Sequence, residues 1–138
     1  MNSRAERDSP IFSRGFEWWM MREARKRNPG LLISILPSGF PGWLGNMSAR
    51  FDRMSPGNPY AHPELLADYV VQYFIGARRV HGIVIDMVGV WNERLYNRDY
   101  VVTLRRQLDY AGFTAVKIIA PDSGLYPQSF IEDFGSNE

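Results

Sequence analysis

Three short apolar runs, separated by two long helix-like segments, constrain the fold of this chain more than any other feature of its sequence. The runs, at residues 31–36, 83–90 and 116–120, are rich in Ile, Val and Leu and have the length of buried strands. The segments between them repeat apolar residues at spacings of three and four, which is typical of helices. Strands that alternate with helices of this length build βαβ units around a parallel sheet. The sequence therefore predicts an α/β fold.

Signals at the ends of the expected helices support this order. A first helix is expected at residues 14–27, before the Pro29-Gly30 stop. Pro63 is suited to the first turn of the second helix, and Asn97 can cap the third. The apolar faces expected to pack are Phe16, Trp19, Met20 and Ala24 in the first helix, Leu66, Tyr69, Val70, Tyr73, Phe74 and Ala77 in the second, and Val101, Leu104, Leu108 and Ala111 in the third.

Length and composition fit one globular domain. The chain has 138 residues, of which 45% are apolar and 22% charged, and its net charge of +1 gives no bias toward nucleic acid. No apolar run reaches transmembrane length, and the polar N-terminus does not resemble a signal peptide. Residues 1–13 are expected to form a loose leader, residues 14–125 the folded domain and residues 126–138 a polar tail. Residues 37–59 form a loop of a length typical of functional or disordered segments.

The sequence lacks the motifs of several cofactor and metal sites. No Gly-x-Gly-x-x-Gly follows a predicted strand and no P-loop motif is present, so a nucleotide site is not supported. Cysteine is absent, which excludes disulfides and thiolate chemistry. His62 and His81 lie far apart without ligand spacing, and positions on the surface or at the edge of the core are the favoured interpretation. No metal site is therefore predicted.

The second apolar run ends in Asn92-Glu93, directly after Trp91. In parallel α/β folds the chemistry is located at the carboxyl ends of the strands. The other two runs end near Ser38 and Asp122. All three ends are expected to open onto one face, where they would line one pocket.

Glu93 has two interpretations at this position. As a general acid it would be partly buried beside Trp91, which would keep the carboxyl protonated near its working pH, while Asn92 would hold a sugar hydroxyl. This pair suits glycoside cleavage, in which a carboxylic acid protonates the leaving oxygen. The structural alternative is that Glu93 caps the next helix or pairs with Arg94 or Arg98.

Two further residues have both structural and functional interpretations. Asp86 lies seven residues before Glu93, and an odd offset within a strand places two side chains on opposite faces. Asp86 is therefore expected to face a helix or to make a structural hydrogen bond. Trp43, in the long loop, can either stack on a ligand or cover the core, and composition does not separate these alternatives.

Five segments of the chain resemble the galactocerebrosidase (galactosylceramidase) family. They are residues 14–29 (RGFEWWMMREARKRNP), 36–45 (LPSGFPGWLG), 76–79 (GARR), 88–94 (VGVWNER) and 116–120 (VKIIA). Each match is short, but the five occur in family order. Together they identify the chain as similar to this glycosidase family over about residues 14–122.

The resemblance implies a (β/α)8 TIM barrel, of which residues 14–125 would hold about three βα units. It implies a retaining hydrolase that releases galactose from galactosylceramide or a related β-galactolipid, with no metal or organic cofactor. The Asn-Glu motif of the family carries over to Asn92 as a sugar-binding amide and to Glu93 as the acid/base. A lysosomal location and a saposin-type lipid carrier as partner follow from the resemblance alone.

The chain departs from the family pattern in two places. In the animal enzymes a substrate-lining tryptophan follows the Leu-Pro pair, but here Ser38 occupies that position, which puts galactose stacking and sugar choice in doubt. Trp43 remains, although it matches a different family position, and both residues are candidates for substrate binding. The loop at residues 46–58 is longer and more basic than expected, with Arg50 and Arg53. Such a loop would alter the mouth where a lipid or its carrier approaches.

A retaining enzyme needs a second carboxylate about 5 Å from the first. In the family this nucleophile comes from the seventh strand, in a Ser-Glu-Asp-Phe context. Glu132-Asp133-Phe134 echoes that context, but too few residues follow Ala120 for the intervening strand and helices, so the echo is interpreted as chance. The chain is expected to be a central barrel segment that does not turn over substrate by itself. The alternatives are a non-catalytic truncated isoform and a barrel glycosidase of another specificity.

Overall fold

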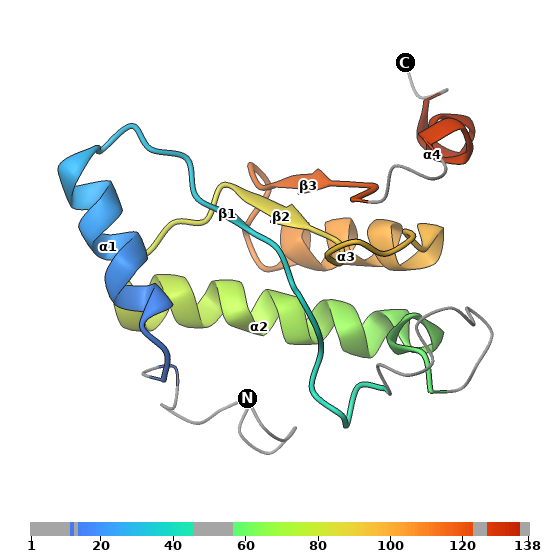
Figure 1. Cartoon of the computed structure of the whole chain (residues 1–138), viewed down its shortest axis with the longest axis horizontal. Helices are drawn as coiled ribbons and strands as arrows, with labels where there is room; N and C mark the ends of the chain where they lie inside the picture. Colours follow the sequence, from blue (N-terminus) through green and yellow to red (C-terminus); the bar gives the residue numbers. More distant parts are fainter. Residues whose placement is uncertain (1–11, 13, 46–56, 123–126, 136–138) are drawn as a thin grey trace.

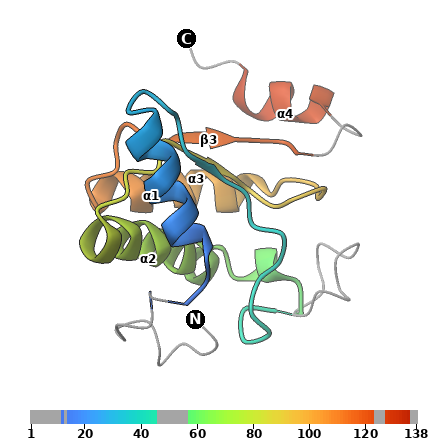
Figure 2. The same ribbon diagram turned by 60° about the vertical axis from the view of Figure 1, so that its left-hand side comes forward.

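The computed structural model describes residues 12, 14–45, 57–122 and 127–135. In chain order the elements are α1 (Glu17–Arg27), β1 (Ser34–Ile35), the 3-10 helix η3 (Pro59–Ala61), α2 (Pro63–His81), β2 (Met87–Gly89), α3 (Arg98–Tyr110), β3 (Lys117–Ile119) and α4 (Pro127–Phe134). Helices α2 and α3 pack against each other beside the sheet, and α4 lies apart from them, past the end of β3 (Figure 1, Figure 2). None of the helices in these ranges is long and apolar enough to cross a bilayer.

The three strands form one parallel sheet in the order β1-β2-β3. Ser34 pairs with Met87, and Met87 pairs with Lys117, so the strands begin level with one another. Helix α2 connects β1 to β2, and α3 connects β2 to β3. The arrangement confirms the predicted α/β class and is consistent with part of a βα barrel.

Helices α2 and α3 bury the faces that the sequence predicted. The residues buried there include Leu66, Val70, Phe74 and Ala77 of α2 and Val101, Leu104 and Leu108 of α3. Pro63 is the first residue of α2, as expected, and Gly82 follows its end with a φ of 63°, a left-handed conformation that favours glycine. Asn97 caps α3 by accepting a hydrogen bond from the Tyr100 N–H at 2.8 Å. Both predicted helix starts are confirmed.

The predicted inner face of α1 is wrong. Phe16 and Trp19 are 68% and 59% exposed, and the buried residue of the helix is Trp18. Its ring stacks on Tyr73 at 4.6 Å and on His81 at 4.5 Å, both on α2. Trp18 and Trp19 point about 100° apart around the helix. Periodicity predicted that Trp19 faces inward, but the aromatic residues of α2 pack against Trp18 instead.

The strands are buried on one face rather than on both. Val88, in the centre of β2, is fully buried, whereas Ile119 on β3 is half exposed. Gly89 has no side chain, and Leu36 covers the place where its Cβ would be. Within the described residues, no second layer covers the face that carries Leu36 and Ile119, so the expectation of strands buried on both faces does not hold here.

The region expected to be a polar tail contains a helix. The aromatic rings of Phe130 and Phe134 on α4 lie 5.1 and 6.0 Å from the ring of Tyr96. The Tyr96 hydroxyl donates to Asp133 Oδ2 at 2.6 Å. Helix α4 is therefore attached to the segment that links β2 to α3. Of the expected leader only Phe12 is described, and it is buried against Gly76 of α2.

Candidate active site

The candidate site begins where β2 delivers Trp91 into the core. Trp91 is 1% exposed. Its ring packs edge-on against Phe40 at 5.2 Å and Tyr60 at 5.3 Å. The chain then turns, so that Asn92 is half-buried and Glu93 is exposed. The buried indole thus anchors the two polar residues that follow it.

Backbone and side-chain hydrogen bonds join the carboxyl ends of all three strands at this turn. The Asn92 N–H donates to the Pro37 carbonyl oxygen after β1, with an N···O distance of 2.9 Å. The Glu93 N–H donates to Asp122 Oδ2 after β3, at 2.8 Å. The predicted meeting of these strand ends at one edge of the sheet is confirmed.

The side chain of Glu93 differs from the expectation in its exposure. It was expected to be partly buried beside Trp91, but the indole points into the core while Glu93 projects outward from a left-handed backbone with φ 53°. The structural alternatives do not hold either, because Asn97 rather than Glu93 caps α3. Arg94 donates to the backbone carbonyl oxygen of Glu93, at 3.2 Å, rather than to its carboxylate. Arg98 lies 6.0 Å from the Phe134 ring.

Ser38 and Trp43 occupy different environments. Ser38 is exposed in the loop after β1, next to the proline that holds Asn92. Trp43 is partly buried against the core, and its ring packs edge-on against Tyr69 of α2 at 5.8 Å. This contact fits the core-covering role of Trp43. The basic part of the loop, with Arg50 and Arg53, lies outside the described residues.

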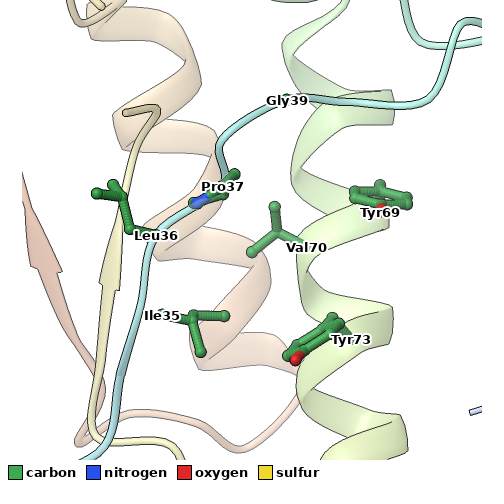
Figure 3. A pocket seen from close by; sticks show the side chains of 7 residues that line it. All are labelled: Ile35, Leu36, Pro37, Gly39, Tyr69, Val70 and Tyr73. Carbon is green, nitrogen blue, oxygen red and sulfur yellow. The ribbon is translucent and has the colours of Figure 1, made fainter. Parts of the chain in front are cut away.

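A small apolar pocket lies between β1 and α2 (Figure 3). Its volume is about 180 Å³. The lining residues are Ile35, Leu36, Pro37, Gly39, Tyr69, Val70 and Tyr73. Neither Asn92 nor Glu93 lines it, although Pro37, which does, accepts the hydrogen bond from the Asn92 N–H.

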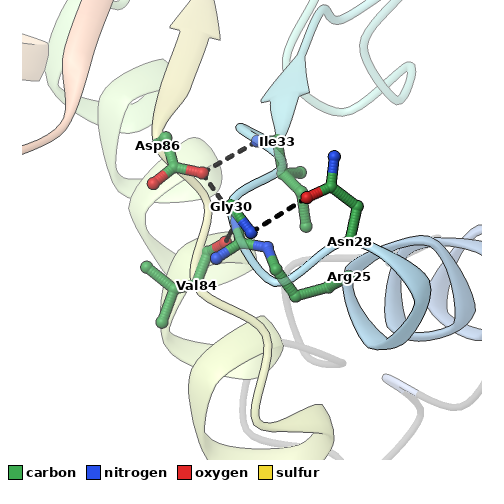
Figure 4. A network of polar contacts seen from close by, with 6 residues as sticks. All are labelled: Arg25, Asn28, Gly30, Ile33, Val84 and Asp86. Atoms are coloured by element: carbon green, nitrogen blue, oxygen red, sulfur yellow. Dashed lines mark hydrogen bonds and ion pairs between the residues drawn. The ribbon is translucent and has the colours of Figure 1, made fainter.

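Asp86 lies before β2 and has a structural environment. Its Oδ2 accepts hydrogen bonds from Arg25 Nη2 at 2.7 Å and from the Ile33 N–H at 2.8 Å (Figure 4). Arg25 also donates to the Val84 carbonyl oxygen at 3.2 Å. These contacts tie α1 and the start of β1 to the start of β2. The prediction that Asp86 makes a structural hydrogen bond is confirmed.

Sequence reasoning located Asp122 at a strand end but gave it no partner. Its contact with Glu93 joins residues 29 positions apart, and no local sequence pattern predicts such a contact. The contact of Tyr96 with α4 was missed as well. The signal available for that helix was the four-residue spacing of Phe130 and Phe134.

Comparison with known proteins matches the whole chain to one family. The family model described as "Glycosyl hydrolase family 59" matches residues 1–138. Galactocerebrosidase of Homo sapiens is 48% identical over 112 residues, covering 81% of this chain and 15% of that protein. A putative galactocerebrosidase of Caenorhabditis elegans is 33% identical over 129 residues, covering 94% and 18%. An endo-1,6-beta-D-glucanase of Neurospora crassa is 27% identical over 123 residues, covering 86% and 25%. The chain thus spans a small part of the length of these relatives.

Proposed function

The chain belongs to glycosyl hydrolase family 59, and on that premise we propose that it is part of the catalytic barrel of a retaining β-galactosidase acting on galactosylceramide or a related galactolipid. Glu93 is the proposed acid/base and Asn92 the proposed sugar-binding amide. The observation that carries the proposal is the turn at the end of β2. Its backbone is bonded to both neighbouring strand ends, and it presents Glu93 to solvent at the edge where such barrels place their chemistry.

In the proposed mechanism Glu93 gives up a proton in the first step and takes one back in the second. In the first step the Glu93 carboxylic acid gives its proton to the glycosidic oxygen as the bond from the sugar carbon to that oxygen breaks and a carboxylate nucleophile takes its place. In the second step the Glu93 carboxylate removes a proton from water as the water oxygen bonds to the sugar carbon, and the bond from that carbon to the nucleophile breaks and releases its carboxylate. Asn92 would hold a sugar hydroxyl through both steps.

The nucleophile is proposed to come from a later strand of the complete barrel of this family. Glu132 and Asp133 do not fit the role, because both lie on α4 rather than at the end of a strand. Asp133 is also engaged by the Tyr96 hydroxyl. Their placement supports the interpretation of the Glu-Asp-Phe echo as chance.

The substrate, location and partner are proposed from the family alone. A galactolipid is the proposed substrate because galactocerebrosidases are among the relatives. A lysosomal location and a saposin-type lipid carrier follow the same resemblance. The exposed loop at Ser38 would then face the sugar without the aromatic platform of the animal enzymes.

The test compares two β-galactosides on the native product that contains this segment, with and without Glu93→Gln. Methyl β-galactoside has a poor leaving group that needs a proton, whereas dinitrophenolate leaves without one. We expect the kcat/KM for the methyl glycoside to fall by about 10²–10⁴-fold, with the dinitrophenyl glycoside little changed. Without its general base the variant should hydrolyse the glycosyl-enzyme slowly, which lowers kcat for the dinitrophenyl glycoside while its kcat/KM is kept. Azide attacks the glycosyl-enzyme without a general base, so it should raise this kcat again and yield galactosyl azide.

Glu23→Gln is the matched control, because Glu23 lies on α1 and pairs with Arg27 at 3.2 Å. It should leave both rates unchanged. Equal losses on both galactosides, or no loss on either, would remove Glu93 from the acid/base role. A native product that hydrolyses neither galactoside would favour the non-catalytic isoform.

A barrel glycosidase of another specificity is the second candidate. Ser38 replaces the family tryptophan, and one relative is an endo-1,6-beta-D-glucanase. We expect kcat/KM for dinitrophenyl β-galactoside to exceed that for the β-glucoside, which differs only at one hydroxyl. The reverse order would favour the second candidate while leaving the role of Glu93 intact.

A further inference from the structure

The backbone of Glu93 is in a conformation that needs support. Its φ of 53° is the one positive value at a non-glycine residue in the part of the chain that the structure describes. A residue with a β-carbon is strained in this left-handed region, and it remains there only where its surroundings hold it. The strain falls on the residue whose carboxyl is proposed to transfer the proton.

The support comes from both neighbouring strands. On one side the Pro37 carbonyl oxygen accepts from the Asn92 N–H. On the other side Asp122 Oδ2 accepts from the N–H of Glu93 itself, at 2.8 Å. The bond that Asp122 accepts ends on a carboxylate oxygen, and hydrogen bonds to an ionised carboxylate are stronger than neutral ones. It acts on the same residue that carries the positive φ.

We propose that Asp122 is a positioning residue for Glu93, holding its backbone so that the carboxyl meets the glycosidic oxygen. This inference rests on the proposed function, because it gives Glu93 the acid role. Asp122 itself transfers no proton and touches no substrate. Without its side chain the turn can relax toward an ordinary negative φ, and the carboxyl of Glu93 would move away from the place where the proton is needed.

The leaving group separates positioning from a merely structural role. A displaced acid slows only the reaction that needs a proton, whereas damage to the fold slows every substrate by the same factor. Displacements of about 1 Å are enough to cost about 10²-fold in rate. We therefore expect Asp122→Ala to lower kcat/KM for methyl β-galactoside by about 10–100-fold and to leave the dinitrophenyl glycoside little changed.

Two further variants guard against a failure to fold. Asp122→Asn keeps an acceptor oxygen at the same reach and should retain most of the activity on the methyl glycoside. Asp122→Ser shortens the side chain so that its hydroxyl cannot reach the Glu93 N–H, and it should repeat the pattern of Asp122→Ala. Combined with Glu93→Gln, Asp122→Ala should add no further loss on the methyl glycoside.

The outcomes distinguish this inference from the proposed function. Three results would overturn the positioning role: equal losses on both galactosides, no loss in either Asp122→Ala or Asp122→Ser, or a full extra loss when Asp122→Ala is added to Glu93→Gln. In each case Glu93→Gln by itself would still lower kcat/KM for the methyl glycoside alone, so the proposed function would stand. If Glu93→Gln itself lacks the leaving-group dependence, the proposed function fails and the inference falls with it.

Discussion

Asp86 and Glu93 are carboxylates at opposite ends of the same strand, and their surroundings assign them different work. Asp86 precedes β2 and satisfies both a cation and a backbone N–H. Glu93 follows β2, and its exposed carboxylate has no hydrogen bond or ion pair with another described residue. In barrels of this kind the amino ends of the strands serve stability and the carboxyl ends serve chemistry. The contacts of Asp86 fit the first part of that division, and the role proposed for Glu93 would fit the second.

Replacing Asp86 should therefore cost stability. In Asp86→Ala the Ile33 N–H and Arg25 both lose the oxygen they share, and a half-buried donor is left unsatisfied. We expect the free energy of unfolding to fall by about 1–3 kcal/mol, measured by urea denaturation of the natural protein that contains this segment.

Asp109→Ala is the matched comparison for Asp86→Ala. Asp109 pairs with Arg105 at 2.6 Å on the surface of α3, and such exposed pairs contribute about 0–1 kcal/mol. Asp86→Asn, which keeps one acceptor oxygen, should fall between the two. Equal effects of the two alanine variants would show that the contacts of Asp86 in Figure 4 do not stabilise the fold.

Some features of single residues could be predicted from the sequence, and others could not. The cap at Asn97 was predictable, because the side chain and the N–H that it binds are three positions apart. The Asn92-Glu93 pair was located correctly at a strand end. The exposure of Glu93 was not predictable, because it depends on a positive φ and on a contact with Asp122 from another strand.

At the scale of elements, the helices were predicted best where one face is clearly apolar. Helix α2 has such a face and buries it, beginning at Pro63 as expected. Helix α1 carries two adjacent tryptophans, so periodicity alone left its orientation open, and stacking of Trp18 on Tyr73 decided it. Helix α4 was missed because its contacts are tertiary: its two phenylalanines gain a packing partner only when Tyr96 is brought to them.

At the scale of the whole molecule, two tyrosine phenols lie in separate layers of the fold, that of Tyr100 fully buried and that of Tyr73 partly buried. Tyr73 lies under Trp18 between α1 and α2, while Tyr100 on α3 packs against Tyr60. The Tyr100 hydroxyl is buried and has no hydrogen-bond partner within the described ranges. Desolvation raises the pKa of Tyr73 to about 12, with Glu17 and Tyr69 adding to the effect. Burial also raises the pKa of Tyr100.

These shifts predict an alkaline loss of stability. In the unfolded chain the phenols ionise near pH 10. As the pH rises from about 10 to about 12, the unfolded state therefore releases protons that Tyr73 and Tyr100 keep in the folded state. Because the unfolded state then binds fewer protons, the free energy of unfolding must fall over this window and be unaffected by these groups below it. Urea midpoints of the native product between pH 9 and pH 12 measure the effect.

Phenylalanine variants identify the source of this alkaline loss. Tyr73→Phe and Tyr100→Phe each remove one phenol of raised pKa, so each should flatten the decline above pH 10. Tyr110→Phe is the control, because that side chain is 96% exposed, and it should leave the decline as it is. At neutral pH, Tyr100→Phe should cost little stability, since the hydroxyl it removes is an unsatisfied buried group. If the urea midpoints of all three variants fall with pH as that of the native protein does, these phenols do not link folding to pH. The packing of α1 and α3 over their rings must then be looser than the structure shows.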